Sequence, residues 1–187
     1  MILFINSCVR EGSRTKKLAD SLLEKLNEDH VELKLEEIDF PKTDENFINN
    51  RSALTAKGAF SDPMFELARQ FAEADKIVIA APYWDLSFPA SLKQYLEIIN
   101  VVGITFKYTD DGFPVGLCRA DSLYYVTTAG GSYVPFEYGF GYVKSLAEAL
   151  YGIKNVRLLK AAGLDIAGAD PEAIMQDAIN NEIPKVL

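Results

Sequence analysis

Short apolar segments alternate with amphipathic ones along the whole chain. Five segments have the length and the continuous or alternating apolar pattern of β-strands: residues 2–6, 31–35, 76–81, 122–128 and 156–162. Five others carry apolar residues at helical spacing: residues 13–26, 63–71, 89–101, 136–151 and the segment from 171 onward. Asp62-Pro63 and Asp170-Pro171 mark two helix starts, because an N-cap aspartate there precedes a proline at the first helical position.

Strands and helices that alternate in this way predict a parallel sheet covered by helices on both faces. With right-handed crossovers, five strands favour an α/β three-layer sandwich with the flavodoxin-like strand order 2-1-3-4-5. We expect a single domain over residues 1–187. Residues 40–61 lack periodicity and are expected to be irregular, and such a stretch is a candidate lid over a site.

Charge and cysteine content narrow the possible partners. The formal net charge is -8, so nucleic acid and anionic membrane surfaces are not expected partners. No apolar stretch approaches the roughly 18 residues that a membrane helix needs. The two cysteines, Cys8 and Cys118, form neither a CxxC zinc motif nor a disulfide framework, and the first residues predict a strand rather than a signal peptide. We therefore expect a cytoplasmic protein.

Ligands of such sheets bind beyond the carboxyl ends of the strands, which directs attention to three loops. The first, SCVREGSRT, leaves a strand and opens a helix, whose free N–H groups form a phosphate site. Ser7, Ser13 and Thr15 add hydroxyl groups, and Arg10 and Arg14 add positive charge that the acidic protein otherwise lacks. The alternative is an ordinary serine N-cap followed by two solvated arginines.

The second loop, PYWDLSFP, is rich in aromatic and apolar residues although it lies at the edge of the sheet, and it contains Trp84, the only tryptophan. An apolar rim of this kind suits a flat aromatic ligand. The alternative is an aromatic cluster packed beneath a neighbouring helix.

The third loop, TAGGSY, contains the pair Gly130-Gly131, which allows the backbone to approach a ligand closely. The alternative is a plain turn between a strand and a helix. The functional interpretation rests on all three loops meeting at the same edge of one sheet.

Several segments of the chain, taken together, resemble the motifs of a known family. The segment AAPYWDLSFPASLKQYLEIINVVGITFKYTDDG resembles the FMN-dependent NADH-azoreductase and NAD(P)H quinone reductase family, whose Gly-Val/Ile-Thr-Phe-x-Tyr element residues 103–108 match closely. The loops SCVREGSRT and VTTAGGSY resemble that family's phosphate loop and its Gly-Gly segment. Together these motifs span residues 2–150 in the family's order.

The resemblance implies a flavodoxin-like homodimer that binds one FMN per subunit at the interface. It assigns the phosphate to Ser7, Ser13, Arg14 and Thr15, with Arg10 beside them. It assigns the isoalloxazine ring to Pro82, Tyr83, Trp84, Asp85 and Leu86, and the far edge of the ring to Thr128, Ala129, Gly130, Gly131 and Tyr133. Phe106 stands where the family places an aromatic residue that reaches the partner's flavin and the substrate.

Two residues depart from the family's pattern. Asp85 replaces a usual asparagine. Its carboxylate would accept a hydrogen bond from the N3–H of the flavin or, if it instead lay near N1, would oppose the anionic reduced flavin. Leu86 replaces a usual phenylalanine, so one stacking face is less aromatic. These changes affect the substrate rather than the fold or the cofactor.

The implied activity is transfer of two electrons from NADH or NADPH to a small aromatic acceptor, a quinone, azo compound or nitroaromatic, by a ping-pong mechanism. No catalytic side chain is required, since the cofactor carries the chemistry. The alternative is a flavodoxin-like electron carrier that acts one electron at a time with a protein partner. A third possibility is a flavodoxin-fold module that has lost its cofactor.

Overall fold

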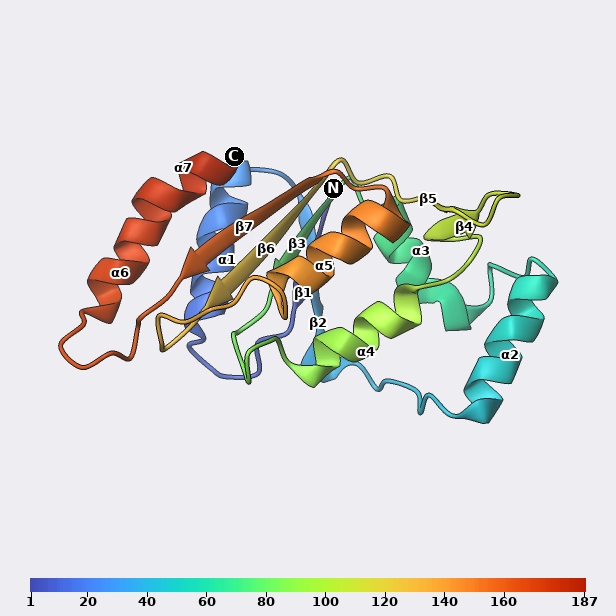
Figure 1. The fold of residues 1–187 in the computed structure, drawn as a ribbon, viewed down its shortest axis with the longest axis horizontal. Helices are drawn as coiled ribbons and strands as arrows, with labels where there is room; N and C mark the ends of the chain where they lie inside the picture. Colours follow the sequence, from blue (N-terminus) through green and yellow to red (C-terminus); the bar gives the residue numbers. More distant parts are fainter.

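The computed structural model describes residues 1–187 and contains a five-stranded parallel sheet (Figure 1). The strands are β1 (Ile2–Asn6), β2 (His30–Lys34), β3 (Lys76–Ala80), β6 (Ser122–Thr128) and β7 (Asn155–Ala161). Their order is β2-β1-β3-β6-β7. Strands β4 and β5 form a separate hairpin, so the order by strand count in the main sheet is 2-1-3-4-5, which confirms the flavodoxin-like prediction.

Helices cover both faces of this sheet because neighbouring residues of its strands point to opposite sides. On one face Leu3 and Ile5 pack in a core with α3 (Glu66–Glu73), α4 (Ala90–Ile99) and α5 (Phe140–Leu146). On the other face Ile2 and Phe4 pack in a second core. That core is closed by α1 (Arg14–Leu26), α6 (Pro171–Asp177), the π-helical η4 (Ala178–Glu182) and α7 (Ile183–Val186).

The predicted helix starts are confirmed. The Asp62 side chain accepts a hydrogen bond from the N–H of Met64 in the 3-10 turn η2 (Pro63–Phe65), which leads into α3. Asp170 accepts from two N–H groups in the first turn of α6. Ser13 accepts from the N–H of Lys16 and caps α1.

Three local predictions were wrong. Residues 40–61 contain α2 (Glu45–Ala56), a helix that has no buried residue, so the sequence shows no apolar stripe there. The strand expected over residues 31–35 ends at Lys34, and Leu35 begins the 3-10 turn η1 (Leu35–Glu37). The helix expected over 136–151 starts only at Phe140 and ends in a π-helical turn, η3 (Ala147–Tyr151).

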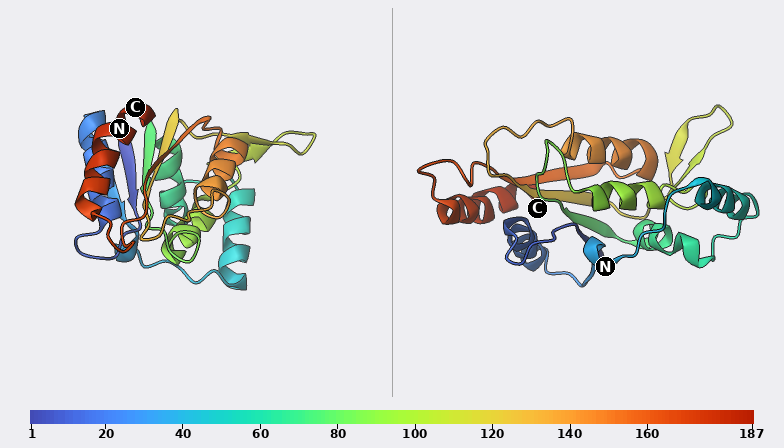
Figure 2. Two further views of the ribbon diagram at one scale, coloured as in Figure 1. Left: turned by 60° about the vertical axis from the view of Figure 1, so that its left-hand side comes forward. Right: turned by 90° about the horizontal axis from the view of Figure 1, so that it is seen from below.

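The hairpin of β4 (Phe106–Tyr108) and β5 (Pro114–Gly116) was not expected, and it projects from the body of the protein (Figure 2). It lies with α2 on the side of the molecule away from the arrowheads of β6 and β7 (Figure 1). Its exposed apolar side chains are Tyr108, Phe113, Val115 and Leu117. None of the helices is both long and apolar enough to span a bilayer.

Candidate cofactor-binding site

A cavity of about 360 Å³ lies at the carboxyl ends of the strands, where a ligand of this fold class binds. The three predicted loops and a fourth loop after β7 line it. The lining residues are Val9, Arg10, Glu11, Gly12, Ser13, Arg14, Thr15, Pro82, Tyr83, Trp84, Thr128, Ala129, Gly130, Leu164 and Asp165. Its volume falls within the roughly 300–1,000 Å³ of small-molecule and cofactor sites.

The first turn of α1 opens into this cavity with free hydrogen-bond donors. The N–H groups of Arg14 and Thr15 have no acceptor in the protein, and both residues line the cavity. Gly12, at φ +70, makes the left-handed turn that leads the loop to the helix start. Unpaired N–H groups and the positive end of the helix dipole bind anions, so this end of the cavity fits a phosphate group.

Direct contacts hold the loops together. The hydroxyl groups of Thr15 and Thr128 are 2.6 Å apart, which joins the start of α1 to the end of β6. The N–H of Tyr83 donates to the carbonyl oxygen of Thr128 at 3.1 Å. The cavity is therefore built by hydrogen bonds between loops that are distant in the sequence.

Both arginines of the first loop already have partners. The Arg10 guanidinium lies 5.9 Å from the centre of the Trp84 ring, in a cation–π contact that joins the first loop to the second. Arg14 pairs with Asp165 at 2.7 Å, across the cavity wall. The free donors for an anion are thus mainly backbone N–H groups.

The second loop contains a strained turn. Trp84 and Ser87 exchange backbone hydrogen bonds of 3.1 and 2.8 Å. Between them Asp85 and Leu86 have φ values of 49 and 67, in the left-handed region that such two-residue turns require and glycine or asparagine normally supplies. Strain retained at the rim of a cavity is typical of functional sites.

Most of the predicted site residues lie together around the cavity: Arg10, Ser13, Arg14, Thr15, Pro82, Tyr83, Trp84, Thr128, Ala129 and Gly130. Asp85, Leu86 and Gly131 are exposed and lie just outside the lining. Tyr133 is 72% exposed and is not part of the cavity lining.

Two predicted residues are placed elsewhere. Ser7 is 1% exposed, and its hydroxyl donates to the carbonyl oxygen of Ala80 at 2.8 Å, beneath the cavity rather than in its lining. Phe106 is 6% exposed and packs edge-on against Tyr108 in the hairpin. Within one chain the structure does not bring Phe106 to the cavity.

The fourth loop, with Leu164 and Asp165, was not among the loops predicted from the sequence to line the site. Its position could have been predicted, because this loop follows the carboxyl end of a predicted strand just as the other three do.

Cys8, which lies in the first loop, is buried, and burial raises the pKa of its thiol. It therefore packs as a small apolar residue.

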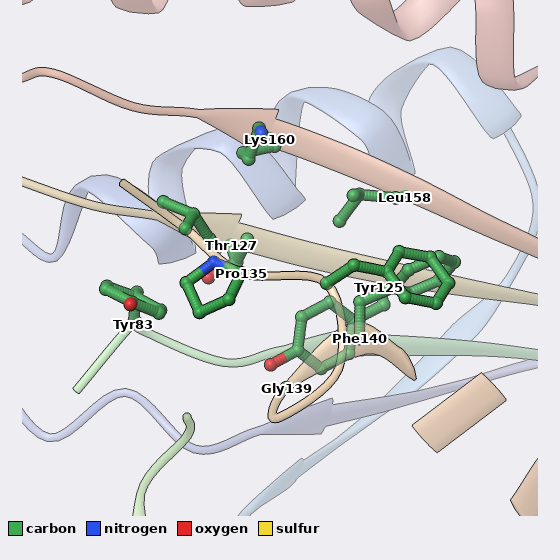
Figure 3. A pocket seen from close by; sticks show the side chains of 10 residues that line it. Tyr83, Tyr125, Thr127, Pro135, Gly139, Phe140, Leu158 and Lys160 are labelled. Carbon is green, nitrogen blue, oxygen red and sulfur yellow. The ribbon is translucent and has the colours of Figure 1, made fainter. Parts of the chain in front are cut away.

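A second, smaller cavity of about 100 Å³ shares Tyr83 with the first (Figure 3). Tyr83 and Thr127 lie at one end of it, and Tyr125 and Phe140 at the other (Figure 3). The buried hydroxyl oxygens of Tyr83 and Thr127 have no hydrogen-bond partner. Loss of hydration raises the pKa of Tyr83.

Replacing Thr127 by valine is expected to raise the free energy of unfolding by about 1 kcal/mol, because a buried hydroxyl without a partner costs about 1–3 kcal/mol. Denaturant unfolding measures the change. Thr105→Val is the matched control: the Thr105 hydroxyl is also fully buried but donates to the carbonyl of Ile99 at 2.8 Å, so this variant is expected to lose stability. If Thr127→Val also lost stability, the Thr127 hydroxyl would have to be hydrogen-bonded to an ordered water in the unaltered protein.

Comparison with known proteins identifies the family. A family model described as a flavodoxin-like fold matches residues 1–182. An FMN-dependent NADH:quinone oxidoreductase of Clostridium beijerinckii is 37% identical over 188 residues, which cover 96% of this chain and 94% of that protein.

Two solved structures are also similar. The azoreductase of Bacillus anthracis str. Sterne superimposes with a TM-score of 0.84 at 27% identity, covering 99% of this chain and 97% of the other. An FMN-dependent NADH-azoreductase of Bacillus anthracis str. Ames Ancestor, solved in complex with FMN, has a TM-score of 0.80 at 25% identity, covering 99% and 96%. The sequence resemblance is thus confirmed over almost the full length of both chains, and this protein belongs to the flavodoxin-like family of FMN-dependent NADH:quinone oxidoreductases and azoreductases.

Proposed function

We propose that this chain binds FMN in the 360 Å³ cavity and passes two electrons from a reduced nicotinamide to a quinone, azo or nitroaromatic acceptor. One observation carries the proposal: free N–H groups at the start of α1 and the aromatic wall of Tyr83 and Trp84 open into the same cavity. A phosphate end and an aromatic end in one cavity match the two ends of FMN. The names and the FMN complex of the relatives support the same cofactor.

The protein's own contribution is binding and orientation. The N–H groups of Arg14 and Thr15 would hold the phosphate, and Pro82, Tyr83 and Trp84 would line the ring. Gly130 leaves room for the backbone of the third loop to approach the ring's far edge. Bound FMN would supply the hydride chemistry, which needs no acidic or basic side chain.

The order of binding follows from the available space. A nicotinamide and an acceptor that use the same open face of the site must occupy it in turn, so the kinetics are expected to be ping-pong. NADH is the expected donor, given the names of the relatives, and NADPH is the alternative donor to compare. Two free cysteines, Cys8 and Cys118, suit a cytoplasmic setting.

We also propose that the chain works as a homodimer. The hairpin exposes four apolar side chains, those of Tyr108, Phe113, Val115 and Leu117. Apolar residues that are exposed singly are common on protein surfaces, whereas a group of them in one element is typical of an interaction site. A stable interface buries at least about 1,000 Å² in total. Phe106 itself is buried, so its exposed neighbours in the hairpin, with Tyr108 and Phe113 the most exposed, would make the contact with a second copy.

An anaerobic visible spectrum recorded after FMN addition and again after NADH tests the proposed function. Bound flavin that bleaches directly to the two-electron form, and is reoxidised by a quinone, is the expected result. Bound flavin that ignores NADH and NADPH, but stops at a one-electron state with dithionite, would favour an electron carrier. Absence of flavin binding would refute the assignment of the cavity.

A further inference from the structure

The fourth loop presents a carboxylate to the anion-binding end of the cavity. Backbone hydrogen bonds fix its position: the N–H of Asp165 donates to the carbonyl of Gly130 at 2.9 Å, and the N–H of Leu164 donates to that of Ala129 at 3.2 Å. The side chain of Asp165 then reaches Arg14 at 2.7 Å. An acidic residue is thus held beside the donors that a phosphate group would use.

The third loop is shaped around this carboxylate. A Cβ atom on Gly130 would lie 2.4 Å from Oδ2 of Asp165, so only glycine leaves the aspartate its present place. The pair itself adds little to stability, because Arg14 and Asp165 are 41% and 67% exposed and exposed ion pairs are weak. The effect of this ion pair is therefore expected on ligand binding at the cavity rather than on the stability of the fold.

The consequence of the pair is electrostatic. Arg14 is the first residue of α1, and its own N–H is one of the free donors at this end of the cavity. A phosphate bound there and the Asp165 carboxylate would compete for the same guanidinium. Arg10 does not replace Arg14 as a partner for the phosphate, because its guanidinium lies over the Trp84 ring.

We propose that Asp165 sets how strongly the cavity discriminates a phosphorylated flavin from an unphosphorylated one, by holding the Arg14 guanidinium away from the phosphate. The proposal rests on the proposed function, because it takes the cavity as the FMN site. It makes Asp165 a specificity-determining residue that weakens the hold on the phosphate and keeps the cofactor exchangeable.

The test compares dissociation constants for FMN and for riboflavin, measured by quenching of the single tryptophan, Trp84, and by titration calorimetry. In Asp165→Asn the backbone hydrogen bonds of the loop remain, while the negative charge is lost. We expect the ratio of FMN affinity to riboflavin affinity to rise about five- to tenfold, the effect of releasing one guanidinium to pair with the phosphate at a partly screened site. In an Arg14→Gln background, the same change is expected to leave the ratio within about twofold.

Glu11→Gln is the matched control, because Glu11 is a second carboxylate of the same lining with no ion pair to Arg14. It is expected to change the ratio less than Asp165→Asn does. An unchanged ratio in Asp165→Asn, an equal loss of both ligands, or a gain that persists without Arg14 would each overturn the proposal. If the unaltered protein bound neither flavin, the proposed function itself would be refuted, which the wild-type titration reveals before any variant is compared.

Discussion

Replacing Ser13 by aspartate is expected to weaken FMN binding about 100-fold while the protein stays as stable as before. Ser13 caps α1 by accepting a hydrogen bond from the N–H of Lys16, and aspartate caps helices as well as serine does. A negative charge at a helix N-terminus is itself favourable. The new carboxylate, however, lies at the free N–H groups of Arg14 and Thr15, where the phosphate is expected to bind.

The magnitude follows from two losses. A like charge at about 4 Å costs about 1–4 kcal/mol, depending on how well water screens it. The carboxylate also competes for the N–H donors of the first turn, and a total of about 2.7 kcal/mol corresponds to a 100-fold change in affinity. Titration calorimetry with FMN measures the affinity, and thermal unfolding checks the fold.

Ser13→Asn is the control for this prediction. Asparagine is an equally good N-cap and has nearly the shape of aspartate, but it carries no charge. It is expected to keep most of the FMN affinity. If Ser13→Asp bound FMN as tightly as the unaltered protein, the phosphate would have to lie away from the start of α1.

The site could be located from the sequence because the carboxyl ends of parallel strands share one edge of the sheet. Once the strands were assigned, the loops with Ser13, Trp84 and Gly130 had to meet there, and they do. The same rule covers the loop after β7, so Asp165 was also within reach of the sequence. The rule says where a loop lies, but it does not say which of its side chains face the ligand.

Ser7 illustrates that limit. The first loop has several hydroxyl-bearing residues, and only the path of the backbone decides that Ser7 turns inward to the carbonyl of Ala80 while Ser13 caps the helix. Arg14 illustrates it as well, because its pairing with Asp165 joins residues 151 positions apart in the chain. Such contacts depend on tertiary geometry that a pattern of residue types does not contain.

Two elements were beyond pattern analysis for different reasons. Helix α2 has no buried side chain, so it lacks the apolar periodicity by which helices are recognised. The strands β4 and β5 have three residues each, which is too short for an alternating pattern to stand out. Both elements lie outside the main sheet, whose strand-and-helix alternation guided the prediction.

Replacing Gly116 by alanine is expected to lower the free energy of unfolding by about 3 kcal/mol or more. Gly116 ends β5 at the base of the hairpin, and a Cβ atom there would lie 2.2 Å from the backbone nitrogen of Gly152 and 2.2 Å from the carbonyl carbon of Tyr151. Overpacking costs about 1–3 kcal/mol where side chains can move aside, and more where they cannot. Here the obstacle is backbone, and Tyr151 is fully buried against Phe71 at a ring distance of 4.8 Å.

Gly112→Ala is the matched control, because Gly112 lies in the turn of the same hairpin and a Cβ atom there meets nothing within 4 Å. Its φ of +80 means that alanine adds only backbone strain, about 1–2 kcal/mol.

Denaturant unfolding compares the stability of the two variants, and sedimentation compares their oligomeric states. If the hairpin joins two copies of the chain, displacing its base in Gly116→Ala shifts the protein toward monomer, whereas Gly112→Ala leaves the dimer intact. A Gly116→Ala variant that is as stable as Gly112→Ala would mean that the hairpin moves freely against η3, and a hairpin that moves freely is a poor anchor for a dimer.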